Sequence, residues 1–205
     1  LLNVPSLPRG LADGNAAYPQ LNALQRYVRR GGGLVVFTGA RAITKFYNDR
    51  LWNQGKGLLP FRIRAQVGSA ARDDEYVRLD PESLRTDGAL AAFEGERAIG
   101  AEMLRFFVFH RVDEMTASAG GEYARPPRVL ARWDDPENSP AVVRRQYGAG
   151  SVIAVYTSAD TDWNDWPQDR AGTYLLTVNY MVRAVARPQR PRSGPVGEPI
   201  VYEVP

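Results

Sequence analysis

Apolar residues near the N-terminus recur at helical spacing. Leu21, Leu24 and Val28 are three and four residues apart, and most positions between them carry charged or amide side chains. This spacing places the apolar side chains on one face of a helix, which the glycines at 31–33 end. Residues 34–37 are all apolar, as in a strand buried on both faces of a parallel sheet. Because an apolar stub at residues 1–4 precedes the helix, the order strand, helix, strand predicts a βαβ unit.

The second half of the chain has the pattern of three strands in succession. Residues 129–133, 141–146 and 151–157 are mainly apolar, and turn-forming residues separate them. Short connections of this kind join antiparallel neighbours, so these strands are expected to extend the sheet in antiparallel fashion. A helix is predicted over residues 170–187, ending before Pro188. Its expected buried stripe consists of Tyr174, Leu175, Val178, Met181, Val182 and Val185.

The composition fits one globular domain. The 205 residues are 44% apolar and 24% charged, which is enough to bury a core. The net charge of +3 comes mainly from scattered arginines, a pattern that does not predict nucleic-acid binding. We expect residues 1–187 to form the domain and residues 188–205 to be a linker with the first strand of a following domain. Because the chain also lacks an initiator methionine, a piece of a longer protein is expected.

The chain contains no cysteine. Disulfides, thiolate metal sites and thiol nucleophiles are therefore excluded. No apolar run approaches the roughly 18 residues that a membrane-spanning helix needs. We therefore expect no direct membrane contact from this part of the protein.

Two segments carry a resemblance to a known family. Residues 27–37 read Tyr-Val-Arg-Arg-Gly-Gly-Gly-Leu-Val-Val-Phe, and residues 147–152 read Tyr-Gly-Ala-Gly-Ser-Val. Both are similar to segments of class I glutamine amidotransferase-like domains, including the trehalose-utilisation type. Four further stretches, at residues 46–48, 58–60, 162–167 and 196–200, complete the pattern. With them, the chain resembles the region after the von Willebrand factor A domain of BatA-like bacterial membrane proteins.

The resemblance implies an α/β fold of the flavodoxin-like type. Such a fold is a three-layer sandwich with a mainly parallel sheet, to which this chain would add its antiparallel extension. The resemblance also implies a soluble domain of a larger, membrane-anchored bacterial protein. Its partners would be other domains of the same polypeptide or a separate protein.

In active amidotransferases, a cysteine occupies the tight turn after the buried strand, where backbone N–H groups stabilise an oxyanion. The resemblance places Thr38-Gly39-Ala40 at this turn, and Ser158-Ala159-Asp160 at the place of the catalytic histidine. The single histidine, His110, is far in the sequence from either place, so a structural role is expected for it. A hydroxyl nucleophile would need a lysine or carboxylate base. We therefore predict a non-catalytic interaction or scaffold domain without a cofactor.

An acidic loop with two tryptophans follows the last predicted strand. Asp160, Asp162 and Asn164 match the first three ligand positions of an EF-hand calcium loop, but Asp165 replaces the required glycine and Ala171 the closing glutamate. No metal site is therefore predicted. Because open α/β sheets bind ligands at the carboxyl ends of strands, a crevice is expected between this loop and the threonine turn. Its expected lining residues are Arg41, Ser158, Asp160, Asp162, Trp163, Asp165 and Trp166.

Three functions remain open for that crevice. In the first, the acids cap the last helix, the tryptophans pack on the sheet edge, and the domain binds partners without catalysis. In the second, one of the acids at 160–165 serves a hydrolase or sugar-acting enzyme, with or without a metal. In the third, Trp163 and Trp166 stack on sugar faces. Buried tryptophans would favour the first function, paired carboxylates in a concave pocket the second, and exposed tryptophans the third.

Overall fold

The computed structural model describes residues 4–8, 10–12, 15–71, 75–86, 88–95, 98–114 and 122–186. Its main helices and strands are, in chain order, β1 (Gly10–Ala12), β2 (Asn15–Ala17), α1 (Pro19–Arg29), β3 (Gly33–Phe37), α2 (Thr44–Phe46), β4 (Arg62–Gly68), α3 (Ala98–Met103), β5 (Val108–Asp113), β6 (Arg128–Arg132), β7 (Pro140–Tyr147), β8 (Gly150–Val155) and α4 (Thr173–Ala186). A π-helical segment, Tyr47–Trp52, directly follows α2. The predicted linker and strand at 188–205 lie outside the described residues.

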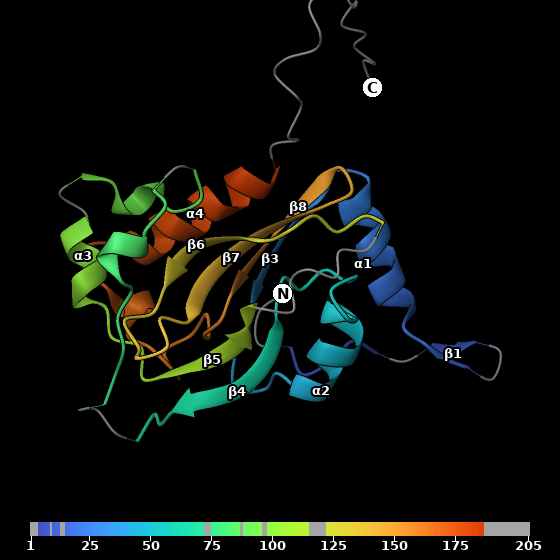
Figure 1. The fold of residues 1–205 in the computed structure, drawn as a ribbon, viewed down its shortest axis with the longest axis horizontal. Coiled ribbons are helices and arrows are strands. Elements are labelled where there is room, and N and C mark those ends of the chain that lie inside the picture. Colours follow the sequence, from blue (N-terminus) through green and yellow to red (C-terminus); the bar gives the residue numbers. More distant parts are fainter. Residues whose placement is uncertain are drawn as a thin grey trace, which may run out of the picture.

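The main sheet contains four strands in the order β3-β8-β7-β6. β3 runs parallel to β8, with Gly33 opposite Ser151 and Phe37 opposite Val155. The other two pairings, β8 with β7 and β7 with β6, are antiparallel. β4 and β5 form a separate antiparallel ribbon, which Figure 1 shows below the main sheet.

The prediction of a flavodoxin-like three-layer sandwich with a mainly parallel sheet is wrong. One of the three pairings in the main sheet is parallel, and β3 lies at the sheet edge and not in its interior. Parallel neighbours need a long crossover connection, whereas a tight turn joins β7 directly to β8 and makes that pair antiparallel. The intervening stretch that could have supplied further parallel strands folds instead into the β4–β5 ribbon.

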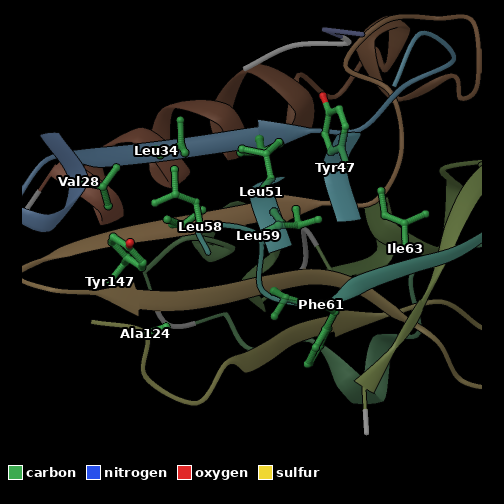
Figure 2. Packing of buried hydrophobic residues seen from close by; sticks show 14 of the residues in the cluster. Val28, Leu34, Tyr47, Leu51, Leu58, Leu59, Phe61, Ile63, Ala124 and Tyr147 are labelled. Carbon is green, nitrogen blue, oxygen red and sulfur yellow. The ribbon is translucent and has the colours of Figure 1, made fainter. Parts of the chain in front are cut away.

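Alternating side chains of the main sheet enter two separate cores. Leu34 and Val36 of β3 belong to the first core, and Val35 and Phe37 pack into the second. Figure 2 shows part of the first core, where side chains of α1, β3, the π-helical segment and residues 58–63 gather. The second core contains the buried side of α4 and several aromatic rings. The sheet is thus apolar on both faces, which explains the continuous apolar runs in β3 and β8.

The end of α1 lies directly against the turn between β7 and β8. The Ala149 N–H donates to the Arg29 carbonyl at 2.9 Å. A Cβ atom at Gly148 would lie 2.6 Å from that carbonyl oxygen, and one at Gly150 would lie 2.1 Å from the Val28 oxygen. Glycine is required at both positions because the two backbones approach so closely. The two segments that carry the family resemblance therefore contact each other.

The last predicted helix is present as α4, but its predicted buried stripe is only partly correct. Thr177, Met181 and Val185 face the protein interior, whereas Leu175 is 74% and Val182 51% exposed. The buried residues are four apart, as expected for one helix face. Because this helix carries apolar residues on more than one side, hydrophobic spacing alone could not identify the side that packs.

None of the helices in the described ranges is long and apolar enough to cross a lipid bilayer.

Candidate functional site

The predicted nucleophile turn directly follows β3. The Thr38 N–H donates to the Val155 carbonyl at 3.1 Å, so the backbone continues the parallel pairing by one residue. The Thr38 side chain is completely buried. Ala40 and Arg41, further along the turn, are exposed. The outer part of this turn therefore reaches the surface, while its threonine hydroxyl does not.

His110 of β5 lies against this threonine. Its Nδ1 atom is 2.8 Å from the Thr38 Oγ1 atom, although the two residues are 72 positions apart in the sequence. The backbone N–H of His110 donates to the Tyr156 carbonyl, which fixes β5 beside the end of β8. His110 was expected to lie apart from the turn because 72 residues separate them along the chain. The two meet because β5 lies beside the end of β8, a tertiary placement that no local pattern indicates.

The Thr38–His110 pair is enclosed by protein. His110 is 2% exposed, and the Trp163 ring contacts it edge-on with ring centroids 5.0 Å apart. Burial lowers the pKa of His110 to about 4, because the interior disfavours the charged imidazolium. The imidazole is therefore neutral near pH 7 and can share a hydrogen bond with the threonine. This is the geometry of a hydroxyl and a base, but neither group faces solvent as a substrate would require.

The polar residues of the acidic loop interact mainly within the loop. Ser158 is buried, its hydroxyl donates to the Asp160 carbonyl, and its own carbonyl accepts from Asn164. The Asp160 carboxylate accepts from the Asp162 N–H at 3.2 Å. Such contacts shape a tight turn. In the described part of the chain, no three histidine or acidic side chains gather as a metal-binding group.

Asp165, near the end of the loop, forms an ion pair with Arg105. The Arg105 Nε atom lies 2.7 Å from one carboxylate oxygen, and the Arg105 backbone N–H donates to the other at 2.8 Å. The pair is partly exposed, so its net contribution to stability is small. Its carboxylate oxygens are both engaged, which leaves this acid poorly suited to act as a free catalytic base.

The cap of α4 comes from Asp169, which is not among the predicted site residues. Asp169 accepts hydrogen bonds from the Thr173 N–H at 3.0 Å, the Thr173 hydroxyl at 2.7 Å and the Ala171 N–H at 3.0 Å. Partial burial opposes ionisation of Asp169, but these three bonds outweigh it and lower its pKa. The prediction that the acids at 160–165 cap this helix is therefore wrong. The signal for Asp169 was its place a few residues before the apolar helix.

Both tryptophans of the loop are buried, as the packing interpretation predicted. Trp163 is 4% and Trp166 1% exposed. The Trp166 indole N–H donates to the Thr173 hydroxyl at 3.1 Å. An indole that is buried and hydrogen-bonded in this way serves the core. Neither ring offers a free face on which a sugar could stack.

Acidification is expected to destabilise the protein through His110. In the unfolded chain this imidazole takes up a proton near pH 6.5, whereas the buried imidazole does so only near pH 4. The unfolded state therefore binds more protons across this range, and the free energy of unfolding falls as the pH drops. At about 1.4 kcal/mol for each pKa unit, the loss by pH 4 approaches about 3 kcal/mol.

Urea denaturation at several pH values would measure this loss in the native protein and in His110→Gln. The variant starts from a lower stability, but between pH 6.5 and pH 4 its free energy of unfolding should fall less steeply with decreasing pH, because the His110 contribution is missing. An equally steep fall in the two proteins would contradict a neutral, buried histidine.

Comparison with known proteins identifies no family. No protein-family model matches the chain, and no curated protein matches its sequence. Its structure is similar to that of the cytoplasmic protein STM3548 from Salmonella typhimurium, with a TM-score of 0.56 and 14% identity over 86% of this chain. The chain spans 65% of that protein. At this identity the similarity concerns the fold alone.

Two further solved structures are similar to this chain only weakly, and neither indicates a function. The cytoplasmic protein STM1381 from Salmonella typhimurium LT2 gives a TM-score of 0.49 and 15% identity over 82% of this chain and 61% of its own. A beta-galactosidase from Bacillus circulans sp. alkalophilus gives 0.45 and 15% over 80% of this chain and 20% of its own.

Proposed function

We propose that this chain is a non-catalytic, amidotransferase-like domain that binds a partner within a larger, membrane-anchored bacterial protein. The observation that carries the non-catalytic part is the burial of Thr38. This residue stands where the resemblance places the nucleophile, it is completely buried, and its hydroxyl is hydrogen-bonded to His110. A nucleophile must reach its substrate, and this hydroxyl has no route to solvent in the described fold.

The acidic loop supports the same proposal. Burial of Trp163 and Trp166 argues against stacking on glycans. Asp165 is held by Arg105, and Asp160 shapes the loop backbone. Such uses of the acids argue against a pair of catalytic carboxylates.

The partner is expected at the exposed rim beside the buried pair. β3 and β8 are parallel neighbours, so the segments that follow them emerge at the same end of the sheet, where both strands have their carboxyl ends. Ala40, Arg41 and Asp162 are exposed there, on loops held in place by the buried residues beneath them. A rigid support with exposed loops is a common arrangement for binding surfaces. We propose other domains of the same polypeptide as the first candidates.

Hydrolysis assays test the non-catalytic part of the proposal. Glutamine, a simple p-nitrophenyl ester and a p-nitroanilide should not be turned over faster by the protein than by buffer. Thr38→Val preserves the shape of the side chain and removes its hydroxyl, while Thr161→Val makes the same change at an exposed loop position. Turnover that persists in Thr161→Val and disappears in a folded Thr38→Val would overturn the proposal.

Hydrogen exchange tests the binding part. The polypeptide encoded by the full reading frame would be compared with this 205-residue chain. Peptides that cover residues 38–41 and 158–166 should exchange more slowly in the longer protein, because a partner domain covers them. Equal exchange at both segments would argue against this surface.

A second candidate is a hydrolase that uses Thr38 as nucleophile and His110 as base. The 2.8 Å contact between their side chains favours it, since a neutral imidazole at this distance can accept the hydroxyl proton. Access would require the Trp163 ring to move away from His110. The same threonine variants distinguish this candidate from the first.

A further inference from the structure

A surface hollow of about 330 Å³ lies at the opposite end of β3 and β8 from Thr38. Its lining residues are Asn22, Gln25, Arg26, Arg29, Tyr123 and Tyr147. Two are arginines, two are tyrosines and two are amides, and none is a carboxylate. The lining therefore offers many hydrogen-bond donors and two positive charges, without an acid among these residues to balance them.

The two arginines come from consecutive turns of α1. Arg26 and Arg29 are three residues apart, so their side chains emerge on the same side of the helix and their charges repel. Among the described residues neither forms a salt bridge. A favourable interaction with the end of the helix dipole accounts for positive charge in this last turn. It does not account for the two phenol groups that face the arginines.

The tyrosines are held in place by the backbone around them. The Gly148 N–H donates to the Tyr123 carbonyl at 2.7 Å, and Ala124 forms a β-bridge with Tyr147. The Arg29 guanidinium lies 4.9 Å from the centre of the Tyr123 ring, and the two tyrosine rings are 6.2 Å apart.

The α1 wall is fixed to the same turn. Figure 1 shows this turn beside the end of α1, where Ala149 donates to the Arg29 carbonyl. The hollow is thus bounded by rigid elements on both sides, which lowers the entropic cost of ligand binding.

The phenol of Tyr147 is available as a donor. The side chain is 6% exposed, and no hydrogen bond of its hydroxyl is found within the described chain. Burial raises the pKa of Tyr147, more than the neighbouring Arg29 lowers it. The hydroxyl therefore keeps its proton at neutral pH and can donate to an anionic oxygen.

We propose that this hollow binds a small phosphate monoester, whose oxygens accept hydrogen bonds from Arg26, Arg29 and the Tyr147 hydroxyl. A phosphate monoester carries a charge of about −1.5 to −2 at pH 7 and three acceptor oxygens, which matches two arginines and a phenol. A carboxylate has one charge and two oxygens, and matches less well. The volume is at the lower end of the range for ligand sites, roughly 300–1,000 Å³, so a small metabolite fits.

Calorimetric titration in low-salt buffer without phosphate tests this proposal. Phenyl phosphate should bind saturably and more tightly than inorganic phosphate, and benzoate should bind more weakly than either. Arg26→Gln should weaken phenyl phosphate binding about tenfold, because it removes a charge-assisted hydrogen bond. Tyr147→Phe, which removes only the hydroxyl, should weaken it about threefold.

Arg30→Gln is the matched control. Arg30 is exposed at the same end of α1, and it does not line the hollow. Its replacement removes the same charge and should change binding less than about twofold. Equal weakening by Arg26→Gln and Arg30→Gln would show a diffuse charge effect and overturn the site. Lack of saturation with both phosphates, or benzoate binding as tight as that of phenyl phosphate, would overturn it as well. Because the hollow is remote from Thr38, none of these outcomes depends on the proposed function.

Discussion

Replacing Arg145 with alanine is expected to lower the free energy of unfolding by about 4 kcal/mol. Arg145 lies in β7 and is 1% exposed. Its Nη1 atom donates to the carbonyls of Gly55, Gly57 and Leu59 at 3.0, 3.3 and 3.2 Å, and its Nε atom to that of Arg125 at 3.2 Å. Truncation would leave the buried carbonyls of Gly55, Gly57 and Leu59 without this partner and would open a cavity.

The segment that Arg145 holds has an unusual backbone. Asn53 and Gln54 have positive φ angles of 46° and 53°, and Gly55 follows with 80°. Consecutive residues in the left-handed region are costly unless other contacts hold them. Burial lowers the pKa of Arg145, an effect that two nearby tyrosines oppose. Its hydrogen-bond partners within the described chain are carbonyls, not carboxylates. The side chain thus fixes this segment by hydrogen bonds and not by an ion pair.

Chemical denaturation and hydrogen exchange would measure the effect of Arg145→Ala. Amides of residues 53–59 should lose protection beyond the global loss of stability, because their support is removed locally. Arg145→Lys keeps the charge but not the planar fork, and should recover about half of the lost stability. Arg170→Ala, at an exposed position, should change stability by less than about 0.5 kcal/mol. A loss below about 1 kcal/mol in Arg145→Ala would contradict this role.

Trp166→Ala is expected to have a comparable effect, also about 4 kcal/mol. The Trp166 ring is 1% exposed, and it lies 6.0, 5.9 and 5.5 Å from the rings of Phe93, Phe106 and Tyr174. Its N–H also donates to the Thr173 hydroxyl at the start of α4. Removing the ring would leave a large cavity in the second core and break this link to the helix.

Thermal and chemical denaturation of Trp166→Ala would be paired with a glycan-binding screen. Trp166→Phe should recover about half of the stability that Trp166→Ala loses, because the phenyl ring fills part of the cavity. Leu175→Ala, at a position that is 74% exposed, is the control and should change stability by less than about 0.5 kcal/mol. A stable Trp166→Ala protein that loses an affinity for sugar would contradict the core role. It would favour the glycan-binding alternative instead.

The sequence by itself determined the local elements and the limits on chemistry. Spacing of three and four residues predicted α1, and the apolar run before Thr38 predicted β3. The glycines between β7 and β8 marked a tight turn. The absence of cysteine excludes thiolate chemistry. All of these are short-range properties, set by side chains within one turn or one strand.

Tertiary structure alone decided which of these elements meet. Local patterns could not place β3 at the sheet edge or pair β4 with β5, and the fold class was wrong for that reason. The contact of His110 with Thr38 spans 72 residues, and that of Arg145 with Gly55 spans 90. No local sequence pattern indicates either contact, because the two residues of each pair meet only when the two cores pack on opposite faces of the sheet. The burial that keeps Thr38 and Trp166 from solvent is likewise a property of the assembled fold.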